Sequence, residues 1–331
     1  MTTRRTTALL LTRGAAAAAG IALLAGCAAG PASAATEAPG SSTADTTARA
    51  TARTSAHPSA RATADGDRAD ARTERADARV VRHLFTRAFP DPSSAPARRT
   101  AAHTVAPDAV THAGGSGPAG LLAVFRADHH RVAGAHAVVA HLASDGDLVA
   151  VHWHLTADVR DERGGEAAVD LFRMADGRVV EHWALRQPVA TGTPSSGNTN
   201  TMFSDLYRAP AGQRHPSEAQ EERNRRLAVG AYDILFRDHD VSVLDRDFDP
   251  AYRQHNPVAP DGTAALRKLF GGGAQFPPQE SVHSLADGDL VWTFSRPVGA
   301  SADDPVTAAD LFRVDGGKIR EHWDVVPPSA G

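Results

Sequence analysis

The chain contains an internal repeat, and this feature limits its possible folds more than any other. Residues 170–186 read DLFRMADGRVVEHWALR and residues 310–326 read DLFRVDGGKIREHWDVV, with eight of seventeen positions identical and no gap. Upstream, HLASDGDLV at 141–149 matches HSLADGDLV at 283–291. A repeat of roughly 140 residues is as long as a domain. The chain of 331 residues is therefore predicted to hold two tandem domains of one fold.

Each copy begins with sequence patterns that are typical of helices. Ala76, Val80 and Leu84 are spaced to form one apolar stripe, which predicts a helix that begins near Thr73. The second copy has a similar stripe, and Ser217 with Gln220 predicts a capping box at its start. A shorter helix is expected next, at residues 117–126 in one copy and 261–270 in the other.

The rest of each copy has the patterns of β-strands. The Asp-Gly turns between alternating apolar runs predict hairpins, and each DLFR strand turns at a glycine into the strand with Glu-His-Trp. The fold class is therefore α+β, with helices packed on one curved antiparallel sheet in each domain. We place the domains at residues 73–203 and 217–331, joined by a linker at 204–216 within a segment rich in Gly, Ser, Thr, Asn and Pro.

The first 26 residues have the pattern of a secretory signal. Arg4 and Arg5 precede a short apolar run, and Leu24-Ala25-Gly26-Cys27 resembles the lipobox of bacterial lipoproteins. That resemblance implies cleavage before Cys27 and lipidation of its sulfur, which predicts a protein lipid-anchored to the cell membrane on the extracytoplasmic side. A plain secretory peptide is the alternative, and both Sec and twin-arginine export stay open. Residues 27–70, rich in Ala and Thr, are expected to form a disordered tether.

Composition narrows the classes of partner and chemistry. The net charge of −4 provides no basic face, so binding to nucleic acid is not expected. Cys27 is the single cysteine, so an internal disulfide is excluded. Lipidation of Cys27 would leave no thiol for cysteine-based catalysis.

Both copies resemble the SnoaL-like polyketide cyclase family. In the second copy the resemblance lies in YRQHNPVAPDG (252–262) and the DLFR to EHW segment. In the first it lies in DGDLVAVHWHL, VDLFRMADGRVVEHW and NTNTMF (198–203). The resemblance implies the cone fold of the nuclear-transport-factor type, present twice. It also implies aldol-type ring closure with an aspartate as acid/base and no metal or cofactor.

The second copy holds the candidate catalytic residues. Because side chains alternate along a strand, His322 and Asp324 share one face, and Asp310 on the neighbouring strand joins them if that face lines the cone. By the resemblance Asp324 is the proton-transfer carboxylate and His255 a polar group of the pocket. Each has a structural alternative: Asp310 could pair with Arg313, His322 could bond a backbone carbonyl, and residues 255–257 could serve only to form a turn. Trp323 is expected to pack between sheet and helix.

The first copy lacks this aspartate, because Ala184 takes its place. Its candidate ligand-binding residues are four histidines and one aspartate: His112, His152, His154, Asp170 and His182. His152 and His154 share a strand face, and with Asp170 they could in principle hold zinc. The family resemblance implies no metal, and none is expected.

Three functions are compatible with these patterns. One is a cofactor-independent acid/base catalyst for a small apolar carbonyl compound, of the aldol or isomerase type. Another is a non-enzymatic ligand-binding or interaction module at the cell surface, and a third is a surface protein whose domains only mediate dimerisation. Export argues against cyclisation of polyketides, whose synthesis is intracellular. The domains could pack on each other or form a homodimer.

Overall fold

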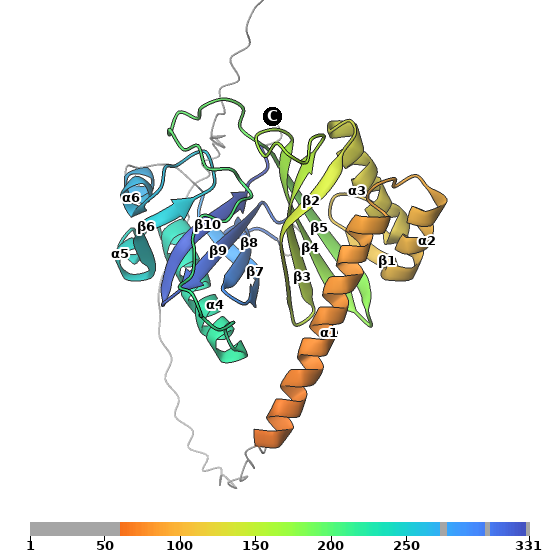
Figure 1. Ribbon diagram of the computed structural model, residues 1–331, viewed down its shortest axis with the longest axis horizontal. Coiled ribbons are helices and arrows are strands. Elements are labelled where there is room, and N and C mark those ends of the chain that lie inside the picture. Colours follow the sequence, from red (N-terminus) through yellow and green to blue (C-terminus); the bar gives the residue numbers. More distant parts are fainter. Residues whose placement is uncertain (1–59, 272–276, 302–304, 329–331) are drawn as a thin grey trace, which may run out of the picture.

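The computed structural model describes residues 60–271, 277–301 and 305–328, and these form two halves of the same architecture (Figure 1). The expected signal peptide, Cys27 and most of the expected tether lie outside the described residues. The first half consists of α1 (Ala60–Arg87), α2 (Ala95–Thr104), β1 (Val105–Thr111), α3 (Gly117–Arg131), β2 (His136–Asp145), β3 (Leu148–Thr156), β4 (Glu166–Ala175) and β5 (Arg178–Pro188). Among the described residues, no helix is both long enough and apolar enough to span a membrane.

The second half repeats this order after a connecting segment, residues 189–216, without helix or strand. It consists of α4 (Glu218–Tyr232), a π-helical turn η1 (Asp233–Arg237), α5 (Val243–Asp247), β6 (Phe248–Gln254), α6 (Thr263–Gly271), β7 (Gln279–Asp287), β8 (Leu290–Pro297), β9 (Ala308–Asp315) and β10 (Lys318–Val325). The α+β class and the two tandem domains are thus confirmed.

Each sheet has five strands in the same order, β1-β5-β4-β3-β2 and β6-β10-β9-β8-β7. Four strands of each sheet form an antiparallel meander, as expected. The fifth differs, because β1 pairs parallel with β5 and β6 pairs parallel with β10. A helix follows each of these edge strands and carries the chain back across the sheet, which makes parallel pairing possible.

One expected helix start is wrong, and one expected capping contact is not formed. α1 begins at Ala60, within the expected tether and well before Thr73, because Ala and Arg favour helix even where no apolar stripe exists. Ser217 is the N-cap of α4, but its side chain makes no capping hydrogen bond. The Gln220 side chain donates instead to Asn224, 2.8 Å away within the same helix.

Three apolar cores hold the molecule together. One fills each cone between its sheet and its helices, with Phe85, Phe125 and Trp153 in the first and Tyr232, Phe248 and Phe312 in the second. The third core joins the two sheets face to face and includes residues of both halves. Figure 1 shows the result, with the two sheets adjacent at the centre and helices on the outer flanks. The domains therefore pack on each other within one chain.

The contact between the halves is pseudo-symmetric at the Asp-Gly hairpin turns. Asp145 accepts the backbone N–H of Ala286 at 2.7 Å, and the equivalent Asp287 accepts the N–H of Ser144 at 3.2 Å. Each repeat thus supplies the same carboxylate to the other repeat's hairpin. This reciprocal contact explains why both copies keep the Asp-Gly-Asp turn.

The two tryptophans of the Glu-His-Trp segments also lie in this interface. His112 stacks on Trp183 with ring centroids 4.8 Å apart, and His255 stacks on Trp323 at 4.6 Å. The expectation that Trp323 packs between sheet and helix is wrong, because the outer face of β10 meets the other sheet rather than a helix. Its near-complete burial comes from His141 of the opposite domain together with His255 and Arg313 of its own.

Candidate functional site

The candidate site is a row of polar side chains across three strands inside the second cone. Thr293 on β8 is opposite Asp310 on β9, which in turn is opposite Asp324 on β10. Residues opposite each other on neighbouring strands project from the same face. The equivalent row in the first cone is Val151, Asp170 and Ala184, with one polar side chain instead of three.

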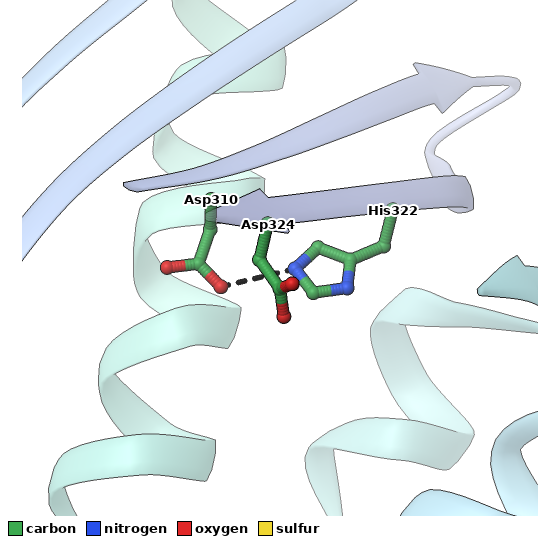
Figure 2. A group of neighbouring side chains, drawn as sticks. All are labelled: Asp310, His322 and Asp324. Atoms are coloured by element: carbon green, nitrogen blue, oxygen red, sulfur yellow. Dashed lines mark hydrogen bonds and ion pairs between the residues drawn. The ribbon is translucent and has the colours of Figure 1, made fainter. Parts of the chain in front are cut away.

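Asp310 and His322 form a hydrogen-bonded pair beside Asp324 (Figure 2). His322 Nε2 donates to Asp310 Oδ1 at 3.0 Å. On the other side of the ring, His322 Nδ1 lies 3.2 Å from Gln254 Oε1, an oxygen that also accepts the backbone N–H of Asn256. Both ring nitrogens therefore face acceptors, which favours the protonated imidazolium form. Burial lowers the pKa of His322, but the hydrogen bond to Asp310 and the charge of Asp324 outweigh it and raise the pKa.

Asp324 has an amide as its partner and no arginine. Its Oδ1 accepts a hydrogen bond from Asn256 Nδ2, and within the described residues no ion pair joins it to Arg or Lys. The pKa of Asp324 is raised to about 6, chiefly by burial of the carboxyl group and also by the charge of Asp310, while His322 and Asn256 oppose the rise. The residue keeps partial solvent exposure at the end of the cone. A carboxyl group of this pKa exchanges protons readily near neutral pH.

Two tyrosines complete the polar lining of the second cone. Tyr252 O accepts a hydrogen bond from Gln254 Nε2 at 2.7 Å, and Tyr232 donates to Ser295 Oγ at 2.7 Å. Burial raises the pKa of both phenols well above the usual value, so both stay neutral. Because Tyr252 accepts from Gln254, its own O–H is available to donate to a ligand.

The first cone neutralises its aspartate with an arginine. Arg186, two residues beyond Ala184 and on the same strand face, forms an ion pair of 2.9 Å with Asp170. Asp170 also accepts from His182 Nε2 at 2.7 Å and from Trp153 Nε1 at 2.6 Å. Burial would raise the pKa of Asp170, but the charge of Arg186 and the bond from His182 lower it to about 2. This carboxylate is permanently ionised at neutral pH and cannot serve as a proton shuttle.

The first cone is also filled by aromatic rings. Trp153 packs against Phe85 and Phe89 with ring centroids 5.2 Å apart in each case, and Arg186 lies over its ring at 4.8 Å. Ser295 takes the place of Trp153 in the second copy, which removes an indole from that cone. The Tyr232 hydroxyl contacts Ser295 at this place. The carboxyl group without an arginine partner thus occurs in the half that lacks the indole.

The structure separates His255 from the other candidate catalytic residues. His255 was expected beside Asp324 in the pocket, but it lies on the outer face of the sheet, where its Nε2 donates to Glu321 Oε1 at 2.8 Å. The chain turns directly after β6, which carries His255 past the edge of the cone and into the domain interface. The equivalent His112 makes the same contact with Glu181 at 2.9 Å. Each histidine binds the Glu of a Glu-His-Trp segment and therefore contributes to the interface between the domains.

His152 and His154 also lie outside the first cone. The buried Nδ1 atoms of His141 and His152 are 3.0 Å apart, and His154 Nε2 lies 2.6 Å from the carbonyl oxygen of Gly164. Asp170 projects into the cone from the opposite face, so the zinc site considered for these residues does not form. The strand alternation that places the two histidines together also separates them from Asp170. Of the five residues expected to bind ligand in this copy, Asp170 and His182 alone share the cone interior.

The structural alternatives for the second copy are resolved by contacts. Arg313 pairs with Glu321, Asp289 and Asp205 in the domain interface and not with Asp310. His322 bonds two side chains rather than a backbone carbonyl. Asn256 does form a turn, because its Oδ1 accepts the N–H of Val258 at 2.9 Å. The same side chain also bonds Asp324, so the turn and the site share this residue.

Asp310, His322 and Asp324 could each offer one ligand atom to a metal ion, since these atoms lie within 4.8 Å of one another. Within this group, His322 Nε2 already donates a hydrogen bond to Asp310. We therefore assign no metal to the group. Metal analysis of the purified protein is the direct test.

Sequence reasoning missed several residues of the two cones. Arg186 could have been found, because it shares the strand face of His182 and Ala184. Thr293 could have been found from its strand position opposite Asp310. The partnership of Asn256 with Asp324 had no signal, because the turn that brings them together depends on tertiary contacts.

The model of the SnoaL-like domain family matches residues 97–182 and again residues 229–322, which is more than half of the chain. The chain belongs to the SnoaL-like family. It carries two tandem copies of the domain, and the second match ends at His322, two residues before Asp324. The search of the curated proteins returned no match.

Several solved structures resemble single domains of the chain. IdmH from Streptomyces antibioticus, a proposed polyketide cyclase, is 24% identical over 33% of this chain and 91% of its own, with a TM-score of 0.27. TsrD from Streptomyces laurentii is 20% identical over 33% of this chain and 89% of its own, with a TM-score of 0.26. A proposed isomerase of the SnoaL-like family from Agrobacterium tumefaciens is 16% identical over 35% and 97%, with a TM-score of 0.29.

Proposed function

We propose that the second SnoaL-like domain catalyses proton transfer next to the carbonyl group of a small apolar compound, in an isomerase- or aldol-type reaction without a cofactor. The observation that carries the proposal is the state of Asp324, a carboxyl group inside the cone with a pKa of about 6 and no arginine partner in the described residues. The equivalent cone of the first half has lost this group to Ala184. The first domain then serves as a scaffold.

The chemistry follows from the groups in the cone. Asp324 in its ionised form removes a proton from the carbon next to the carbonyl. The electron pair of that C–H bond forms a C=C bond, and the π pair of the carbonyl moves to its oxygen to give an enolate. The free O–H of Tyr252 donates a hydrogen bond to the enolate oxygen that forms. The protonated Asp324 then returns its proton at a new position, or the enolate carbon attacks a second carbonyl. His322, held by Asp310, keeps positive charge beside the carboxylate.

The substrate is expected to be small. Buried aromatic side chains, including Tyr232, Tyr252 and Phe312, fill much of the second cone. Cyclic and aromatic ketones of one or two rings are therefore suitable probes.

Deuterium exchange tests the proposal without knowledge of the natural substrate. The protein is incubated in D₂O with cyclohexanone and 1-indanone, and loss of the proton signal next to the carbonyl is followed by NMR. We expect exchange above the buffer rate, and Asp324→Asn should reduce the enzymatic part by about 100-fold or more. Asp170→Asn is the matched control in the first cone, where exchange should be unaffected. Undiminished exchange in Asp324→Asn would sink the proposal.

A non-enzymatic binding module is the second candidate function. Two features of the first cone favour this function: Asp170 is ion-paired with Arg186, and aromatic rings fill the cone. The first copy has therefore already lost the groups for proton transfer. If neither ketone exchanges while both bind, as seen by changes in tryptophan fluorescence, this second function is the correct one.

We further propose that the protein is exported and lipid-anchored through Cys27 on the extracytoplasmic side of the cell membrane. The support is the sequence of residues 1–27, with its basic start, short apolar run and lipobox-like Leu-Ala-Gly-Cys. In a bacterial host, Cys27→Ser should move the protein from the membrane fraction to the soluble fraction. A variant that stays on the membrane would contradict lipidation at this cysteine.

A further inference from the structure

The connecting segment between the two halves packs against the turn that follows β6 in the second cone. Asn198 in this segment is buried, although its two direct neighbours Gly197 and Thr199 are exposed. Its Nδ2 donates to the carbonyl oxygens of Gln254 and Ala259 at 2.8 Å and lies 3.1 Å from that of Asn256. One side-chain amide thus makes hydrogen bonds to both ends of the turn.

Neighbouring residues of the segment strengthen this attachment. Asn200 Nδ2 donates to the carbonyl oxygen of Gln254 and to Asp261 Oδ1, each at 2.9 Å. Ser196 Oγ donates to the carbonyl oxygen of Pro257 at 2.6 Å. The segment that follows β5 therefore contacts the second cone, and it also contacts Glu162 and Arg163 of the first half.

The turn held in this way carries two side chains of the candidate site. Asn256 donates to Asp324, and Gln254 faces His322 Nδ1. A single intervening residue therefore connects Asn198 to each of the two groups that we place in proton transfer, Asp324 and His322. Because a buried hydrogen bond constrains direction as well as distance, the amide of Asn198 controls where Asn256 and Gln254 point.

The first cone shows what happens without such an attachment. Its equivalent turn after β1 is closed by its own backbone, with Gly114 N donating to Thr111 O at 2.9 Å. Ala113 takes the place of Asn256 and cannot donate from its side chain. His182 Nδ1, the counterpart of His322 Nδ1, is buried without a hydrogen-bond partner in the described part of the chain. The attachment and the complete polar network therefore occur together.

We propose that Asn198 is a positioning residue, through which the segment that follows the first domain completes the proton-transfer site of the second. This inference rests on the proposed function for the role of Asp324. The contacts of Asn198 with the turn do not depend on the proposed function, since they can be tested without turnover. Asn198 touches neither Asp324 nor His322 directly, so its effect passes through the turn.

Titration of the Asp324 side-chain carboxyl by ¹³C NMR in the full chain provides the test. The hydrogen bond from Asn256 lowers the pKa of Asp324, so a loosened turn should raise that pKa. Asn198→Ala is expected to raise it by about 0.5–1 unit, the value of one hydrogen bond. Thr199→Ala, at the exposed neighbouring position, is the matched control and should titrate like the parent protein.

Two further variants keep the test decisive. In an Asn256→Ala background, Asn198→Ala should add little, because the bond it supports is already gone. If Asn198→Ala does not fold, Asn200→Ala replaces it, with a smaller rise expected because Asn198 still holds the turn. A parent-like pKa of Asp324 in Asn198→Ala, or in Asn200→Ala where that variant replaces it, would overturn the proposal. Because the titration needs no substrate, absence of ketone exchange would count against the proposed function alone.

Discussion

At the scale of single residues, the two halves differ most at the position after the repeated tryptophan. Asp324 inside the second cone has a pKa raised by burial to about 6, above the value of 3.8 for a free Asp side chain. A carboxyl group of this kind binds its proton more tightly in the folded than in the unfolded chain. Its contribution to folding is therefore fully present below about pH 4 and is lost as pH rises through about 6.

Asp324→Asn should remove this pH-dependent loss of stability. The raised pKa corresponds to about 3 kcal/mol at most between pH 4 and pH 7. Urea denaturation at pH 4.5 and pH 7.5 should show that the variant gains stability relative to the parent protein at the higher pH. If the difference between variant and parent is the same at both pH values, Asp324 is not a buried carboxyl group of raised pKa.

At the scale of elements, β5 and β10 show how one strand serves two purposes. Their outer faces carry Glu and Trp of the repeated motif into the domain interface, and their inner faces carry His and the differing residue into the cones. The alternation of a strand was sufficient to predict that His322 and Asp324 share a face. It was not sufficient to predict which way His255 points, because His255 lies just beyond β6, where the alternation no longer applies.

Arg186 at the end of β5 should be essential to the first cone. Arg186→Met leaves Asp170 and Asp128 buried without its charge, which is expected to cost about 3–5 kcal/mol. Thermal and urea unfolding measure this loss, and Arg160→Met on the exposed loop after β3 is the matched control. A loss below about 1 kcal/mol would show that the buried ion pairs of Arg186 do not hold the first cone together.

Arg186 also determines how the first cone responds to acid. Because the pKa of Asp170 is lowered to about 2, its contribution to stability is present above about pH 4 and is lost as pH falls through 2. The two cones thus have opposite pH dependence at equivalent rows of their sheets. The difference arises because the first cone has Ala184 where the second has Asp324, and because Arg186 pairs with the aspartate of the first cone.

At the scale of the whole molecule, the two domains form a dimer-like pair within one chain. The repeat, the α+β class and the four meander strands of each sheet could be predicted, because hairpin turns and strand alternation are local signals. The face-to-face packing of the sheets could not, since Trp183 and Trp323 have the same apolar pattern whether a helix or another sheet covers them. Nor could the attachment of Asn198 to the second cone, which depends on contacts between residues more than fifty positions apart.

The central claim is that one cone of this pair keeps a proton-transfer carboxyl group while the other has neutralised its own. The most direct measurement is ¹³C NMR titration of the side-chain carboxyls of Asp170 and Asp324 in the same protein sample. The structure predicts an apparent pKa near 6 for Asp324 and near 2 for Asp170. A pKa below about 4 for Asp324, within the range of an ordinary Asp, would contradict this claim.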